Sequence, residues 1–161
     1  MTSEPVHYLS LMDVSVRLRS GELKPAALTE AILARIARHD GALKSYTTLF
    51  ADRAMAKARE AEEELGRGFW RGPLHGVPIA VKDLCYTDFA PTAGGMLIHK
   101  DFIPPYTSTV VERLERAGAV GRIVGRRQPG GAGVHGFNGV GTGRGWAGRA
   151  ERTGGALGLQ D

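Results

Sequence analysis

A lysine at the end of a short apolar run is the residue of this sequence best placed to carry out chemistry. Residues 77–81 (Val-Pro-Ile-Ala-Val) favour a buried strand, and Lys82 and Asp83 follow them directly. Active sites of α/β sheets gather where strands end, and a lysine desolvated there can accept a proton near neutral pH. Lys82 is therefore the candidate catalytic base, although the lysine taken alone is more typical of a surface group whose ammonium reaches into water.

The elements that would position Lys82 are predicted from capping residues and apolar spacing. Ser10 favours the start of a short helix that ends near Gly21. Pro25 suits the first turn of a second helix, whose apolar residues recur every four positions. The remaining predictions are a strand at 46–50, a helix at 51–65, a strand at 77–81, a turn at 94–95, a helix after 108 that ends at Gly118, and a further strand from 119. Alternating helices and strands indicate an α/β architecture.

Four motifs, in the same order along the chain, resemble those of the amidase-signature family. The most informative is residues 72–83 (Gly-Pro-Leu-His-Gly-Val-Pro-Ile-Ala-Val-Lys-Asp), which resembles the family's N-terminal signature. Residues 20–23 (Ser-Gly-Glu-Leu) are similar to the family's opening, residues 91–95 (Pro-Thr-Ala-Gly-Gly) to its threonine-rich turn, and residues 107–120 to its next helix and strand. The resemblance covers roughly residues 8–126, and several motifs in order make it far more specific than one short pattern.

This resemblance implies the N-terminal portion of a mixed-sheet α/β/α amidase-signature fold, and hydrolysis of a carboxylic amide. The family includes general amidases and the amidase subunit of tRNA-dependent amidotransferases. In its intact members a lysine pairs with a serine in a cis peptide, which relays a proton from a second, nucleophilic serine. Lys82 occupies the lysine position, and backbone amides of a Gly/Ser-rich loop would stabilise the oxyanion. The resemblance further implies a small-molecule amide as substrate and no cofactor.

The serines of this triad are missing from the sequence. In the family they lie well downstream of the lysine, in a Gly-Ser-Ser-Gly-rich loop and the segment after it, whereas the last serine here is Ser108. Thr142 and Thr153 stand in no comparable context. We therefore expect residues 1–126 to form a partial amidase-signature domain, and the chain as given to be a truncated, inactive form.

Residues 127–161 form a tail rich in glycine and arginine. The last 41 residues hold 14 of the 23 glycines and the entire net charge of +4, but neither serine nor lysine. Such a composition buries too little apolar surface to offset the entropy of ordering, which favours disorder. A shifted reading frame is the other explanation. One permitted back-translation of residues 127–136, read one base later, gives Ala-Asn-Leu-Ala-Glu-Leu-Ala-Phe-Thr, which resembles the family's continuation.

Two alternative functions rest on other features of the sequence. The chain could be a non-catalytic fragment that binds a partner, or its Arg/Gly-rich tail could bind nucleic acid through arginine on phosphates and aromatic rings on bases. The tail offers only Phe137 and Trp146 as aromatic residues, which argues against a nucleic-acid partner. Residues 131–136 fit the pattern Gly-x-Gly-x-x-Gly, but no predicted strand precedes them, and we attribute the match to chance.

The remaining signals exclude several classes of protein. Cys85, the only cysteine, is expected to be a small buried apolar side chain; without an internal disulfide, a cytoplasmic location is favoured. The five histidines lack metal-ligand spacing, so no metal is expected, and His75 is assigned to the turn that enters the lysine strand. No apolar run approaches the roughly 18–20 residues of a membrane span, and no secretory signal is predicted. The identity of the amide and the oligomeric state stay open.

Overall fold

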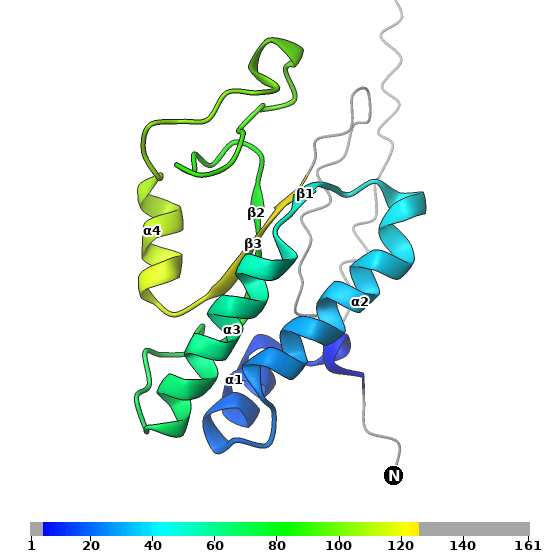
Figure 1. Cartoon of the computed structure of the whole chain (residues 1–161). Helices are drawn as coiled ribbons and strands as arrows, with labels where there is room; N and C mark the ends of the chain where they lie inside the picture. Colours follow the sequence, from blue (N-terminus) through cyan, green and yellow to red (C-terminus); the bar gives the residue numbers. More distant parts are fainter. Residues whose placement is uncertain (1–4, 126–161) are drawn as a thin grey trace, which may run out of the picture.

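The computed structural model of the chain describes residues 5–125, and the side chains of residues 5–121. In chain order its elements are the 3₁₀ turn η1 (Val6–Tyr8), α1 (Leu11–Ser20), α2 (Pro25–Leu43), β1 (Tyr46–Leu49), α3 (Ala51–Gly66), β2 (Pro78–Lys82), the 3₁₀ turn η2 (Leu97–His99), α4 (Thr109–Arg116) and β3 (Val120–Gly125). Figure 1 shows α3 lying beside both α2 and the sheet. The predicted order of helices and strands is confirmed.

The first helix begins and ends at the residues that capping rules predict. Ser10 Oγ accepts a hydrogen bond from the backbone N–H of Asp13 at 3.1 Å, and the Asp13 carboxylate accepts one from the backbone N–H of Ser10 at 3.3 Å. This reciprocal capping box satisfies amides that the first turn of a helix leaves unpaired. Gly21, with φ of 77°, ends α1 in the left-handed conformation that favours glycine.

The larger core lies between α1, α2 and the segment that leads into β2. The predicted stripe of Leu28, Ile32 and Ile36 is buried, and it packs with Leu18 of α1 and with Val77. Full burial of one such aliphatic side chain contributes roughly 1.5–3 kcal/mol to stability. The docking of α2 therefore fixes the position at which the chain enters the lysine strand.

Three strands form a mixed sheet in the order β1-β3-β2. Strand β2 runs parallel to β3, with Lys82 opposite Gly125, and β1 runs antiparallel to β3 on its other side. Helix α3 covers β3 through small residues, because Ala58 and Ala61 are buried in one cluster with Val120. Alanine side chains let the helix backbone approach the sheet closely, so α3 holds the central strand and, through it, β2.

Two predictions near the lysine are wrong. Strand β2 begins at Pro78, one residue later than predicted, and its burial is not continuous, since Val81 is buried while Ala80 and Lys82 are exposed. Among the described residues only β3 pairs with β2, and an apolar run becomes buried on both faces only where neighbours cover it. Cys85 is half-buried instead of buried, because it lies in the turn after this edge strand.

The predictions for residues 127–161 lie outside the described residues. They concern the disordered or frame-shifted tail, the glycine pattern at 131–136 and the Arg/Gly-rich nucleic-acid segment. In the part of the chain that is described, no helix combines the length and the apolar character needed to cross a membrane. The same part contains no group of three or more His, Cys, Asp or Glu side chains placed to hold a metal ion.

Candidate active site at the end of strand β2

Lys82 is the last residue of β2, and its side chain is exposed to solvent. The backbone carbonyl of Lys82 accepts hydrogen bonds from the amides of Leu84 and Cys85, at 2.7 and 3.0 Å. These bonds turn the chain, so the lysine stands at the carboxyl end of the parallel pair β2–β3. This is the edge at which α/β sheets hold their active sites. Lys82 therefore stands where its sequence position indicated, while its catalytic role stays a prediction.

Asp83 connects the lysine to the turn at residues 92–95. The Asp83 side chain is buried, and its Oδ1 atom accepts a hydrogen bond from the backbone N–H of Ala93 at 2.9 Å. Gly94 in the same turn has φ of 58°, and a Cβ atom there would lie 3.8 Å from the Asp83 carbonyl oxygen. Buried polar side chains are generally held by hydrogen bonds, so this contact ties the turn to the residue next to Lys82.

The Lys82 side chain has no polar partner within the described part of the chain. Among the described residues, no hydrogen bond or ion pair engages the Lys82 ammonium. Residues 5–121 therefore place a candidate base at the sheet edge, but they do not assemble a nucleophile and relay around it.

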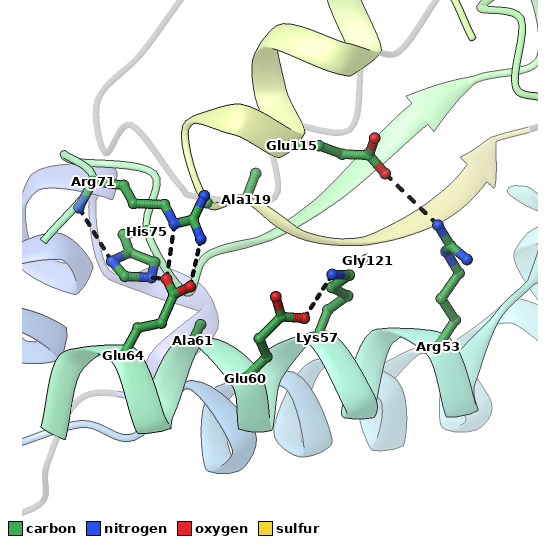
Figure 2. A pocket seen from close by; sticks show the side chains of 11 residues that line it. Arg53, Lys57, Glu60, Ala61, Glu64, Arg71, His75, Glu115, Ala119 and Gly121 are labelled. Carbon is green, nitrogen blue, oxygen red and sulfur yellow. Dashed lines mark hydrogen bonds and ion pairs between the residues drawn. The ribbon is translucent and has the colours of Figure 1, made fainter. Parts of the chain in front are cut away.

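A second cluster of titratable residues lies at the opposite end of β2, next to the turn that precedes its first residue. The carboxylate of Glu64, on α3, lies against both Arg71 and His75 (Figure 2). The Arg71 guanidinium donates two hydrogen bonds to it, from Nε to Oε2 at 2.8 Å and from Nη2 to Oε1. His75 Nε2 is 2.9 Å from Glu64 Oε2, an ion-pair distance, although its N–H is not aligned for a hydrogen bond. His75 Nδ1 accepts from the backbone N–H of Arg71 at 3.3 Å. These contacts stabilise the turn that leads into β2 and hold it against α3.

A cavity of about 200 Å³ opens beside this cluster, and its lining includes residues of α3 and of the turn that precedes β3. The charged side chains along it are paired, Lys57 with Glu60 at 2.6 Å and Arg53 with Glu115 at 4.0 Å (Figure 2). A ligand site needs polar groups that converge on the ligand instead of on each other. We therefore interpret this cavity as structural, and Lys82 is not part of its lining.

Burial lowers the pKa of His75 below its ordinary value of 6.5, a shift that the nearby charge of Glu64 opposes. Hydrogen bonds from Arg71 hold the pKa of Glu64 below its ordinary value of 4.5. At neutral pH the folded protein therefore contains a neutral His75 beside an ionised Glu64. Both groups bind protons less readily in the folded state than in the unfolded state, so both favour folding at higher pH.

We expect the free energy of unfolding to fall as the pH drops below the ordinary pKa of histidine. In that range the unfolded chain binds the His75 proton more readily than the folded chain, which favours unfolding by at most about 1.4 kcal/mol per pH unit. Urea denaturation at pH values of about 7.5 and 5.5 measures the loss, and His75→Asn should make the two curves more alike. An identical pH dependence in that variant would rule out His75 as its source.

The position of the lysine could be predicted from the sequence, but the groups that support its strand could not. The assignment of His75 to the turn is confirmed, whereas its pairing with Glu64 requires a helix end and a turn to fold back on each other. For Asp83 a signal was present, since an acidic residue directly after an apolar strand is buried only if it has a partner. The partner is the backbone amide of Ala93, and a backbone group cannot be recognised from the sequence as a hydrogen-bond partner.

Known proteins share the sequence of this region. The family model described as Amidase matches residues 27–127. The protein named "Putative amidase AmiD" of Mycobacterium tuberculosis is 47% identical over 126 residues, which cover 78% of this chain and 26% of that protein. A glutamyl-tRNA(Gln) amidotransferase subunit of Chloroflexus aurantiacus is 42% identical over 121 residues, which cover 75% of this chain and 24% of that protein. The chain spans about a quarter of the length of these curated relatives.

Solved structures share its fold as well. The native peptide amidase of Stenotrophomonas maltophilia aligns with a TM-score of 0.66 at 36% identity, over 71% of this chain and 24% of that one. A bacterial aryl acylamidase of the amidase-signature family aligns with a TM-score of 0.68 at 24% identity, over 76% and 26% of the two chains, and shows the same fold. The chain belongs to the amidase family, and it carries the N-terminal portion of the mixed-sheet α/β/α amidase-signature fold.

Proposed function

We propose that this chain supplies the general base of an enzyme that hydrolyses carboxylic amides, and that Lys82 is this base. The observation that supports the proposal is the position of Lys82 within the region matched by the family. Lys82 ends a strand of the parallel pair, its side chain is exposed, and no described residue forms an ion pair with it. A lysine at this edge can meet a substrate and a nucleophile that approach from beyond the strand.

In the proposed reaction a serine hydroxyl from outside the described region attacks the amide carbonyl. Its proton passes through a second serine, held in a cis peptide, to the neutral amine of Lys82. Backbone amides of a Gly/Ser-rich loop stabilise the oxyanion of the tetrahedral intermediate. The intermediate then expels ammonia or an amine, which takes up the proton, and leaves an acyl-serine. Water attacks the acyl group, releases the carboxylic acid and restores the serine.

The proposed substrate class is a small-molecule amide, and the proposed location is the cytoplasm. Relatives named as a peptide amidase, an aryl acylamidase and part of an amidotransferase all align with this same portion of the fold. The names of the peptide amidase and of the amidotransferase subunit both refer to an amide group, which supports an amide as the substrate class.

We propose further that residues 1–161 are inactive by themselves. The last serine of the sequence is Ser108, which precedes α4 and belongs to no Gly-Ser-Ser-Gly loop. A base without its nucleophile and oxyanion donors loses nearly all of the rate enhancement that the complete group provides.

The experiment that tests the proposal completes the domain. Residues 1–125 are joined to the part of AmiD that follows its matched region, and intact AmiD is first assayed on a panel of simple amides. The chimera is then assayed on an amide that intact AmiD is found to hydrolyse. We expect the chimera to hydrolyse the amide, whereas the 161-residue chain alone shows only the background rate. Turnover by the 161-residue chain would contradict the proposed inactivity, and a folded but inactive chimera would contradict the proposed hydrolase function.

A further inference from the structure

Asp83 is the one acidic residue that is buried in the described part of the chain. Its exposed fraction is 5%, and the other buried polar residues there are serine, threonine and histidine. Acidic side chains are almost never fully buried unless they have a partner. Lys82, directly before it, is exposed. The chain therefore turns the side chain of the candidate base to solvent and the next side chain to the interior.

The partner of the Asp83 carboxyl group is itself held in place. The backbone N–H of Ala93 donates to Asp83 Oδ1 at 2.9 Å, and this bond joins two points ten residues apart. On one side of this amide, Thr92 is buried, and its own N–H donates to the carbonyl of Phe102 at 2.8 Å. On the other side, the carbonyl of Ala93 accepts from the amide of Met96 at 2.9 Å. The Asp83 side chain is thus fastened to an ordered turn.

The backbone of Lys82 is held from two sides. On the sheet side, Lys82 pairs with Gly125 of β3, at the end of the parallel register. On the other side, its carbonyl accepts from the amides of Leu84 and Cys85, which closes a tight turn around Asp83. The lysine ammonium forms no hydrogen bond or ion pair with a described residue. Within this part of the chain, the direction of the lysine side chain therefore depends on the backbone that carries it.

We propose that Asp83 is the positioning residue of Lys82. Its carboxyl group holds residue 83 against the turn at residues 92–95, and this contact sets the direction in which the Lys82 side chain leaves the strand. A displacement of about 1 Å at a reacting group can lower a rate by about 10²-fold, because proton transfer requires hydrogen-bond distances. The inference rests on the proposed function, since this positioning affects catalysis only if Lys82 is the base.

A direct electrostatic effect of Asp83 on the lysine is the competing explanation. The two side chains belong to adjacent residues, yet they form no ion pair, and Asp83 Oδ1 is occupied by the amide of Ala93. The buried carboxyl group and the exposed lysine instead act on the same short piece of backbone. The proposed role therefore depends on where the acceptor oxygen lies, and an amide oxygen in the same place should fulfil it.

Three substitutions of Asp83 in the chimera separate position from charge. Asp83→Asn keeps an acceptor oxygen in a side chain of the same shape, Asp83→Glu keeps a carboxyl group but moves it by one methylene, and Asp83→Ala removes the acceptor. We expect kcat for amide hydrolysis to stay within about three-fold in the asparagine variant. In the other two it should fall by about 10²-fold, with KM changed far less, because the base acts only in the transition state.

Asp88→Ala is the matched control for the loss of an acidic side chain. Asp88 lies in the same segment, but it is exposed, and it accepts a hydrogen bond from the hydroxyl of Thr107 at 2.9 Å instead of contacting the lysine turn. We expect this variant to keep the kcat of the unaltered chimera at equal concentrations of folded protein. If Asp83→Ala does not fold, the comparison of Asp83→Asn with Asp83→Glu still decides between position and charge.

Hydrogen exchange in the 161-residue chain tests the contact without any assay of activity. The Ala93 amide should exchange about ten-fold or more faster in Asp83→Ala than in the unaltered chain, and at a similar rate in Asp83→Asn. Unchanged exchange in Asp83→Ala, equal kcat in all folded Asp83 variants, or a glutamate variant more active than the asparagine variant would overturn the positioning role. If Lys82→Ala is inactive while every Asp83 variant is fully active, the positioning role alone is wrong. Full activity in Lys82→Ala would instead overturn the proposed base.

Discussion

Replacing Lys82 by alanine in the chimera is expected to lower kcat for amide hydrolysis by about 10³-fold or more. The proton of the nucleophile then has no acceptor, and the other members of the catalytic group cannot act without it. Lys82→Arg should fail as well, because a guanidinium keeps its proton near neutral pH. Steady-state kinetics at equal concentrations of folded protein measure both effects.

The folded state should survive these substitutions, because the Lys82 side chain is exposed and forms no hydrogen bond or ion pair with a described residue. Surface changes of this kind usually alter stability by less than about 0.5 kcal/mol. Lys57→Ala is a matched control, since it removes another exposed lysine, whose ammonium pairs with Glu60 on α3. The control should keep its activity. If Lys82→Ala retained most of the activity while remaining folded, Lys82 would not be the base.

Local chemistry explains why the helices and the lysine strand could be predicted from sequence. Ser10 and Asp13 satisfy each other's amides, Gly21 accepts a left-handed φ, and Ala58 with Ala61 marks the face of α3 that meets the sheet. Each of these signals involves residues close together in the chain. The position of Lys82 at the end of a strand is predictable for the same reason, because the change from apolar residues to a charged residue marks where the strand ends.

Contacts between distant segments could not be predicted in the same way. Ala80 belongs to an apolar run, yet it is exposed, because burial depends on which strands lie beside β2. Leu97 and Ile98 are apolar as well, and they too are exposed at the surface. In both cases the sequence pattern describes the environment in a complete domain, whereas the described residues contain only part of it. Composition alone does not separate these situations.

Gly118→Ala is expected to destabilise the chain far more than a typical glycine substitution. Gly118 has φ of +82°, and a Cβ atom there would lie 2.6 Å from His75 Cδ2 and 3.1 Å from His75 Cα. The ring cannot move aside easily, because His75 is buried and lies between Glu64 and the amide of Arg71. The Gly118 carbonyl also accepts the amide of Gly76 at 2.9 Å, so a shift would disturb the entry to β2.

Gly68→Ala separates this steric effect from backbone strain. Gly68 has nearly the same φ, +79°, but a Cβ atom there would meet nothing within 4 Å. We expect Gly68→Ala to lose about 1–2 kcal/mol from the left-handed backbone alone, and Gly118→Ala to lose about 1–3 kcal/mol more from overpacking. Urea denaturation of the 161-residue chain compares the two variants. Equal losses would mean that the turn at Gly118 relaxes freely, and that the close packing of His75 against it does not fix the start of the lysine strand.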